Sequence, residues 1–224
     1  MRILWLLLVP MVAASGWDVG DTSQADILVN GESVGTAVRT VQDDHVIIDI
    51  TLTASPVALQ IRETYTEPGV LLRVQEFRDG EAVRATTYPD GLDRAFLDRP
   101  VGAAWNETLR RLTESMTPDG VHVDDTNITR HLEVAAIETR DVAGESVRVR
   151  IVDERTGVNG TFTRHILDAQ TGAPLGTEIH TPQTVQTTHW TQASWLGDEP
   201  TAQAPGVGWL LLAVGLLWCA RRQG

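Results

Sequence analysis

The middle of the chain contains short runs of Val, Ile, Leu and Thr that end at Gly, Pro, Asp or Asn. Residues 46–52, 59–66, 70–77 and 82–88 are runs of this kind, and the same pattern returns at 132–140, 146–152, 160–167 and 175–180. Runs of this length, bounded by turn residues, are typical of antiparallel strands joined by hairpins. The sequence therefore predicts an antiparallel sheet within residues 16–188.

Short motifs recur at the predicted turns. Gly31-Glu32-Ser33-Val34, Gly80-Glu81-Ala82-Val83 and Gly144-Glu145-Ser146-Val147 share the pattern Gly-Glu-small-Val. Segments 153–157 and 168–172 share the pattern Asp-x-x-Thr-Gly. An Asp side chain can cap a turn and Gly can adopt a positive φ angle, so we interpret both motifs as structural turns rather than binding sites.

Segment 101–116 has a helical pattern instead. Pro100 suits the first turn of a helix, and Pro118-Asp119-Gly120 would end it. We therefore predict an α+β fold, a mainly antiparallel β meander of hairpins with one packed helix over residues 101–116. The apolar residues that fall within about 80° of one another on this helix are Val101, Trp105, Leu109, Leu112 and Met116.

Both ends of the chain resemble targeting signals. Arg2, an apolar run to Ala14 and then small residues form the pattern of a signal peptide over residues 1–15, with an uncleaved anchor as the alternative. Near the other end, an uncharged apolar run is followed by Arg221-Arg222. The positive-inside rule keeps this Arg pair in the cytoplasm. We expect a transmembrane helix over residues 207–220, a cytoplasmic tail over 221–224 and an ectodomain outside the cell.

The last 20 or so residues also resemble a known sorting signal. Pro205-Gly206, the apolar segment and the terminal Arg pair are similar to the PGF-CTERM tails that archaeosortases process, although Val207 stands where that family has Phe. The resemblance implies a surface protein whose tail is cleaved and replaced by lipid. The chain has no Lys, so its 18 basic residues are all Arg, and its acid excess resembles that of secreted proteins from salt-loving archaea.

Composition excludes several classes of partner. With 30 Asp and Glu against 18 Arg, the net charge is −12, which is the wrong sign for binding nucleic acid through its phosphates. The acids form no long block, so we interpret them as a solvated surface suited to high salt. The single cysteine, Cys219, lies in the predicted span and excludes an intramolecular disulfide.

Three of the four asparagines begin the glycosylation pattern Asn-x-Ser/Thr. They are Asn106, Asn127 and Asn159. Such sites must lie on the surface of a translocated domain to be modified. We predict that they carry glycans, while a Thr-rich sequence forming the pattern by chance is the alternative.

Residues with catalytic or metal-binding chemistry are sparse. No nucleophile elbow, phosphate loop or zinc-protease motif occurs, so we assign no catalytic, cofactor or metal residue. His122 and Asp124 share a face of a strand, with Asp125 beside them and His131 nearby, but acidic chains supply such groups freely. His165 and His180 follow two of the turns and are expected to be neighbours across strands, in a structural pair.

We therefore predict an extracytoplasmic domain at 16–188, a stalk at 189–206 and a single membrane span. Trp190 and Trp195 in the stalk either rest on the bilayer or pack back on the domain. We predict a glycosylated cell-surface protein with a non-catalytic envelope or binding role and no cofactor. One alternative is a carrier of a lipid or other apolar ligand, which an apolar cavity of about 300 Å³ or more between helix and sheet would favour. The other is a hydrolase that uses His122 and Asp124.

Overall fold

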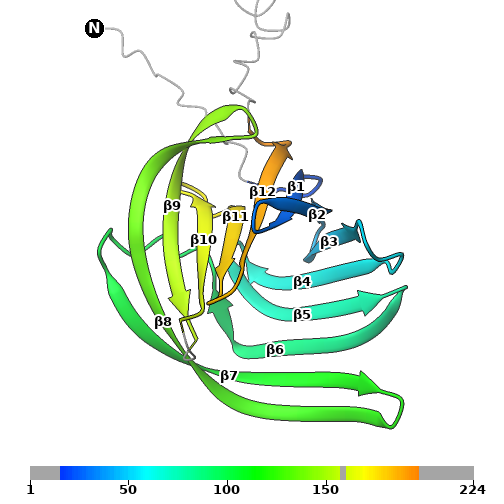
Figure 1. Ribbon diagram of the computed structural model, residues 1–224. Helices are drawn as coiled ribbons and strands as arrows, with labels where there is room; N and C mark the ends of the chain where they lie inside the picture. Colours follow the sequence, from blue (N-terminus) through cyan, green and yellow to red (C-terminus); the bar gives the residue numbers. More distant parts are fainter. Residues whose placement is uncertain (1–15, 157–159, 197–224) are drawn as a thin grey trace, which may run out of the picture.

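The computed structural model describes residues 16–156 and 160–196, and these residues form one closed antiparallel barrel (Figure 1). Every strand pairs with the strands that precede and follow it in the sequence, and β1 closes the ring by pairing with β12. The strands are β1 (Thr22–Val29), β2 (Glu32–Val41), β3 (His45–Leu52), β4 (Leu59–Glu67), β5 (Val70–Arg78), β6 (Glu81–Asp93), β7 (Ala104–Thr117), β8 (Gly120–Val142), β9 (Glu145–Arg155), β10 (Phe162–Asp168), β11 (Pro174–His180) and β12 (Val185–Ala193).

The predicted helix over residues 101–116 is wrong, and with it the α+β fold class. Most of that segment is strand β7, which forms a continuous antiparallel ladder with β8 from Ala104 to Thr117. In a strand, Trp105 and Leu109 lie on one face while Leu112 and Met116 lie on the other, so the predicted stripe is split. Five residues matched a helical spacing, but the ladder with β8 decided the structure, as tertiary context often does.

The predicted hairpin turns with the Gly-Glu pattern are confirmed. Asn30-Gly31, Asp79-Gly80 and Ala143-Gly144 each have positive φ at both residues. Two consecutive positive φ values define the tight turn whose twist matches that of antiparallel strands. These turns join β1 to β2, β5 to β6 and β8 to β9.

The Asp-x-x-Thr-Gly pattern has two different roles. Asp168 caps the β10–β11 turn, because its Oδ1 accepts hydrogen bonds from the backbone N–H groups of Gln170 and Thr171, both at 2.8 Å. Asp153 instead lies within β9 and accepts two hydrogen bonds from Arg164 on β10. The turn interpretation is right for the second segment; in the first, Asp153 is not a turn cap, and Gly157 lies outside the described residues.

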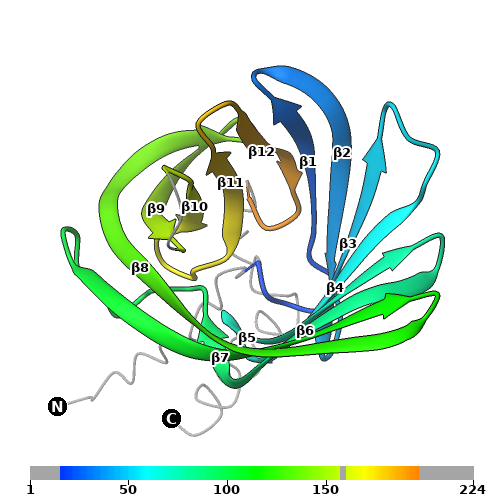
Figure 2. The ribbon, with the colours of Figure 1, turned by 60° about the horizontal axis from the view of Figure 1, so that its bottom comes forward.

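Strand β8 is long enough to serve two neighbours in turn. Its first part pairs with β7 as far as Glu133, and its second part pairs with β9 from His131 onward. The β7–β8 hairpin runs beside β6, with its turn on the same side of the barrel as the β5–β6 turn, as Figure 2 shows. The β6–β7 ladder is short, with pairs only from Arg84 to Thr87 on β6.

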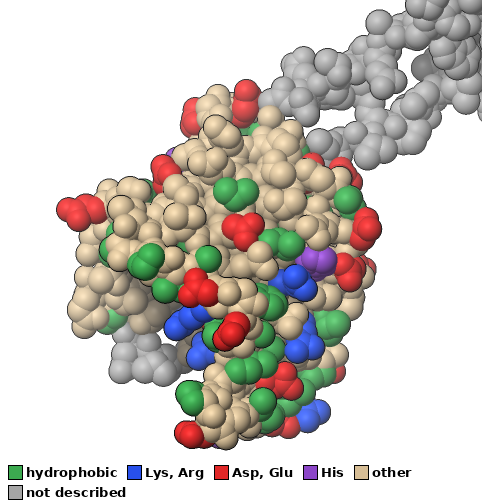
Figure 3. Space-filling view, turned by 90° about the vertical axis from the view of Figure 1, so that its right-hand side faces the viewer, with side chains coloured by type: hydrophobic (Ala, Val, Ile, Leu, Met, Phe, Trp, Pro, Cys, Tyr) green, Lys and Arg blue, Asp and Glu red, His purple; other side chains and the backbone are tan. Residues whose placement is uncertain are grey.

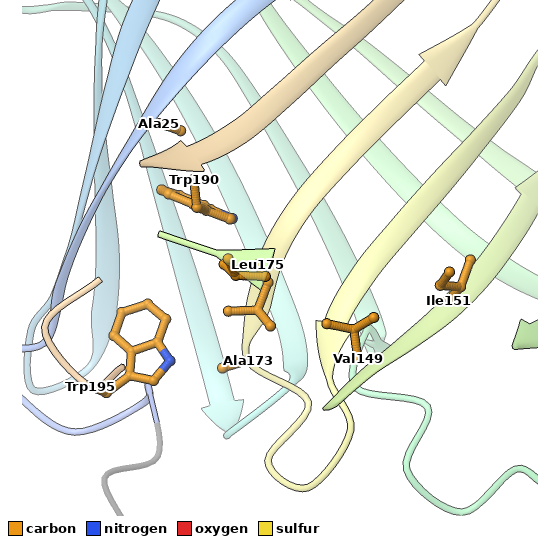
Figure 4. Packing of buried hydrophobic residues seen from close by; sticks show 8 residues of the cluster. Ala25, Val149, Ile151, Ala173, Leu175, Trp190 and Trp195 are labelled. Atoms are coloured by element: carbon orange, nitrogen blue, oxygen red, sulfur yellow. The ribbon is translucent and has the colours of Figure 1, made fainter. Parts of the chain in front are cut away.

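Buried side chains form separate clusters around the barrel. The largest joins β1, β9, β11 and β12 with the segment after β12, and Figure 4 shows Trp190 and Trp195 within it. Packing on the domain is therefore the alternative that the structure supports for these two residues. A second cluster is centred on Phe96, from the β6–β7 connection, and includes Leu132, Val134, Val152 and Leu167.

The acid excess of the sequence is visible on the surface of the protein. On the face seen in Figure 3, Asp and Glu side chains are scattered, and Arg side chains lie among hydrophobic ones lower on the same face. Many carboxylates are in ion pairs across strands, such as Asp125 with Arg110 and Glu114 with Arg73. The charge is therefore distributed over the surface and does not form one acidic patch on this face.

Candidate functional site

A cavity of about 290 Å³ lies on the inner side of the barrel. It is lined by a continuous arc of neighbouring strands that runs from β10 through β12 and β1 to β4, with Trp17 and Arg94 from the adjoining segments. Because successive side chains of a strand alternate between its two faces, each strand contributes residues two apart to the wall. On β2, for example, Ala37 and Arg39 line the cavity while Val38 between them is exposed.

Most of the cavity wall is apolar. The residues of this wall come from several strands and include Trp190 of β12. Since apolar walls with a few polar groups are the usual design of small-molecule sites, this cavity is the candidate site. The apolar lining residues are Ile27, Ala37, Ile48, Ile50, Ile61, Leu167, Pro174 and Trp190.

The first polar group of the cavity is an ion pair on β4 and the segment after β6. Arg94 Nη1 donates to Glu63 Oε1 at 2.7 Å, and the Tyr65 hydroxyl donates to Glu63 Oε2 at 2.7 Å. Burial alone would raise the pKa of Glu63, but the Arg94 charge and the Tyr65 hydrogen bond outweigh it and lower that pKa. Burial and the Glu63 carboxylate raise the pKa of Tyr65, so Tyr65 keeps its proton and remains a donor.

The second polar group is Arg39 of β2, whose side chain is almost completely buried. Its Nη1 donates to the carbonyl of Gly16 at 3.0 Å. The guanidinium carbon lies 5.0 Å from the ring centre of Trp17 and 5.6 Å from that of Trp195, within cation–π range. Burial lowers the pKa of Arg39, yet an arginine remains charged in proteins.

A third group links the cavity to the core beside it. His165, which lines the cavity, has its Nε2 3.0 Å from Glu154 Oε2. Arg130 lies between Glu154 and Glu107, with its Nη1 3.5 Å from Glu154 and its Nη2 2.6 Å from Glu107. Burial would raise the pKa of Glu154, but the His165 hydrogen bond and the nearby cations lower it.

Acid should unfold this protein partly through the carboxylates of Glu63, which is buried, and Glu154, which is partly buried. The pKa values of Glu63 and Glu154 are lowered from 4.5 on folding, so the stability they provide is present above about pH 4.5 and is lost as the pH falls through their folded values. We expect Glu63→Gln to lower the free energy of unfolding at neutral pH and to flatten its decline below about pH 4.5. Urea unfolding measured across this pH range tests this.

The control for this prediction is Glu81→Gln, which changes an exposed carboxylate at the start of β6. This variant should keep the wild-type pH profile. An unchanged slope in Glu63→Gln would show that other acids control the acid transition.

Two of the predicted glycosylation sites lie on the β7–β8 hairpin. Asn106 and Asn127 are both exposed, and they share one face of the hairpin, because Asn106 is opposite His131 and Asn127 is opposite Arg110. Asn106 Oδ1 lies 2.5 Å from His131 Nδ1. Asn159 lies outside the described residues. Glycosylation of all three stays a prediction.

The His and Asp residues considered for chemistry do not converge. His122 and His131 are at different points of β8, opposite Ser115 and Asn106. Asp124 is in an ion pair with Arg111 at 3.9 Å. Within residues 16–156 and 160–196, no cluster of three or more His, Cys, Asp or Glu could hold a metal ion.

The expectation that His165 and His180 are neighbours is wrong. His165 pairs with Thr177 across the β10–β11 ladder, whereas His180 pairs with Phe162 at the far end. His180 stacks on Phe162 with ring centres 4.3 Å apart. Each histidine has a carboxylate partner of its own, Glu154 for His165 and Glu178 for His180.

Sequence reasoning missed the polar groups of the cavity. Arg39 had a detectable signal, because strict alternation along residues 35–41 puts it on the same face as Ala37 and Val41. Glu63 likewise follows Ile61 by two residues. A charge on the apolar face of a strand is therefore the signal that marks these residues as functional candidates.

The predicted segments at the two ends are not covered by the structure. The signal peptide, the transmembrane segment 207–220, the tail 221–224 and most of the stalk lie outside the described residues. Strand β12 continues to Ala193, beyond residue 188. Among the residues that the structure describes, no helix has the length and hydrophobicity needed to cross a bilayer.

Comparisons with known proteins identify no family. No family model matches the chain, and no curated protein matches it. One similar solved structure is the hypothetical lipoprotein YmcC from Escherichia coli K12, at 13% identity and a TM-score of 0.39, over 82% of this chain and 90% of that protein. Similarity at this level assigns neither a family nor a function.

Proposed function

We propose that this protein is a non-catalytic, membrane-anchored binding protein of the cell surface that carries an apolar ligand inside its barrel. The cavity beneath β1–β4 and β10–β12 is the observation that supports the proposal. Its volume of about 290 Å³ is close to the roughly 300 Å³ expected of a carrier, although it is lined by strands and their adjoining segments and not by a helix and a sheet. The surface location rests on the two ends of the sequence.

The size of the cavity limits the ligand. Ligand pockets usually measure about 300–1,000 Å³, so 290 Å³ is at the lower end of that range. One medium-length hydrocarbon chain or a small ring system fits this volume better than a two-chain lipid. The proposed ligand is therefore a single-chain amphiphile or a compound of similar size.

The hydrolase alternative has less support. His122 and Asp124 lie on the extended β7–β8 hairpin and do not line the cavity. Asp124 is in an ion pair with Arg111, and His122 is exposed on the same hairpin. A binding role accounts for the apolar cavity. A hydrolase based on His122 and Asp124 does not account for it.

Chain-length dependence of binding tests the proposal. We expect straight-chain alcohols of about six to fourteen carbons to bind the purified full-length chain, held in amphipol, with affinity rising about fourfold per added methylene. The increase should stop once the cavity is full. Calorimetric titration measures this series, and an affinity independent of chain length would contradict a carrier function.

Adjacent positions on β2 provide a matched pair of variants. Ala37→Phe places a ring inside the cavity, so the plateau should move to shorter chains and the affinity of the longest alcohols should fall about tenfold or more. Val38→Phe adds the same ring on the exposed face of the strand and should leave the series unchanged. Equal effects of the two variants would indicate that the ligand binds elsewhere.

A further inference from the structure

The charge of the cavity wall is opposite to that of the whole protein. Two guanidinium groups, Arg39 and Arg94, line it together with a single carboxylate, Glu63. Arginine and carboxylate charges alone give the wall one excess positive charge, although the chain carries −12. The cavity is therefore electrostatically suited to a ligand with one negative charge.

Arg39 is the cation that lacks a counter-ion in this wall. Its side chain is 1% exposed, and its Nη2 has no hydrogen-bond partner among the described residues. Glu63 is already bound by Arg94 and Tyr65. The nearby Asp21 favours the charged form of Arg39 but forms no ion pair with it among the described residues, and its Oδ2 accepts a hydrogen bond from the backbone N–H of Asp18 at 3.0 Å. A buried charge is stable only when it is paired, which points to a partner from outside the chain.

More unsatisfied polar atoms surround Arg39. Ser23 lies directly opposite Arg39 in the β1–β2 ladder, and its buried Oγ has no partner in the described part of the chain. The same holds for the indole Nε1 of Trp190, which lines the cavity, and of Trp195, whose ring contacts the Arg39 guanidinium. Guanidinium and indole groups only donate hydrogen bonds, and a hydroxyl can donate one. An oxygen group that only accepts is the kind of partner that Arg39 and Trp190, the two of these residues that line the cavity, both lack.

Arg39 and Trp190 line the cavity from β2 and β12, on either side of β1, whereas Ser23 and Trp195 lie next to them outside its lining. Ser23 and Ala25 are two residues apart on β1 and therefore share a face. Ala25 is opposite Trp190 of β12, and Ser23 is opposite Arg39 of β2. Figure 4 shows Trp190 beside Ala25, with Trp195 below them. The donors thus lie where β12, β1 and β2 meet, and the apolar wall formed by Ile48, Ile50 and Ile61 lies on the neighbouring strands.

We propose that Arg39, assisted by Ser23 and Trp190, binds the anionic head of the carried ligand, a carboxylate or a phosphate monoester, while the apolar wall holds its chain. This inference rests on the proposed carrier function and names the ligand class, a single-chain anionic amphiphile. No bond is made or broken in this binding step.

A head-group series on one chain length tests the inference. Dodecanoate, dodecyl phosphate, dodecanol and dodecylamine are titrated into the full-length chain in amphipol at about pH 8, where the carboxylic acid is ionised. We expect one or both anions to bind at least about tenfold more tightly than dodecanol, and dodecylamine to bind most weakly. The better of the two anions distinguishes a carboxylate ligand from a phosphate ligand.

The Arg39→Met variant identifies the group responsible. It should remove the preference for the anion and leave the affinity for dodecanol within about twofold, because the apolar wall is unchanged. Arg39→Lys should retain part of the preference, since it keeps the charge but loses the planar donor pair. Arg84→Met removes an exposed arginine of β6 and should have no effect.

The outcomes separate the two proposals. If none of the four compounds binds, the carrier function fails. If all four bind equally, the carrier function stands and the anion site is wrong, and the same conclusion follows if Arg39→Met keeps the anion preference. Should Arg39→Met fail to fold by circular dichroism, the wild-type head-group series still decides the inference.

Discussion

Replacing Arg130 with Met should lower the free energy of unfolding by about 3–5 kcal/mol. The Arg130 side chain is 1% exposed and lies between the carboxylates of Glu107 and Glu154. Its Nη2 also donates to the backbone carbonyl of Asp93 at 2.8 Å, which ties the segment after β6 to β8. Removing the guanidinium leaves two partly buried carboxylates close together without their cation, so the loss exceeds the value of the ion pairs themselves.

Arg110→Met is the matched control for Arg130→Met. Arg110 makes two hydrogen bonds to Asp125 across the same β7–β8 ladder, but both partners are exposed. Exposed pairs contribute less than about 1 kcal/mol, so this variant should be nearly as stable as wild type. Urea denaturation of both variants measures the difference, and equal losses would show that burial of Arg130 has no energetic consequence.

Substituting Gly69 with Ala should lower the free energy of unfolding by about 2–5 kcal/mol, because two separate penalties add. Gly69 has a φ of +84° in the β4–β5 turn, a conformation that L-residues avoid. A Cβ atom there would also lie 2.4 Å from the Cβ of Ala95. Gly172 of the β10–β11 turn approaches Ala95 with a corresponding distance of 2.6 Å, so Ala95 is held between the two turns and has little room to move.

Gly80→Ala separates the two penalties. Gly80 has a nearly identical φ of +85°, yet a Cβ there would meet nothing within 4 Å. Gly80→Ala should therefore lower the free energy of unfolding by the backbone penalty alone, about 1–2 kcal/mol. Adding Ala95→Gly to Gly69→Ala should recover part of the difference. If thermal or urea unfolding gives Gly69→Ala and Gly80→Ala the same stability, the contact with Ala95 is unimportant.

The sequence allowed the hairpins to be predicted because their signals are local. The run at residues 46–52 corresponds to β3 and that at 70–77 to β5, within a residue at each end. Strands β1, β2 and β12 were not predicted, because Ser, Thr, Gln and Arg alternate with their small apolar residues and weaken the strand pattern. The pairing of β1 with β12 also has no local signal, so barrel closure could not be read from adjacent residues.

The candidate site depends on that closure and was correspondingly harder to predict. A carrier was one of the alternatives, but its cavity was placed between a helix and a sheet, and the helix is strand β7. Glu63 and Arg94 are 31 residues apart, and Arg94 lies in an irregular segment, so their pairing follows from tertiary structure alone. Arg39 and Glu63 are the cavity charges that the alternation of their own strands assigns to the interior.

The closing seam between β1 and β12 has a consequence for the order of folding. Every other ladder joins consecutive strands, but the seam brings together groups 172 residues apart, such as Thr22 and Ser194. Closing so long a loop is entropically costly, so we expect the hairpins to form early and the seam last. Contacts made last mainly control the unfolding rate. Arg39 and Trp190 lie on either side of this seam. A ligand bound to both residues would therefore slow the unfolding of the ligand-bound barrel.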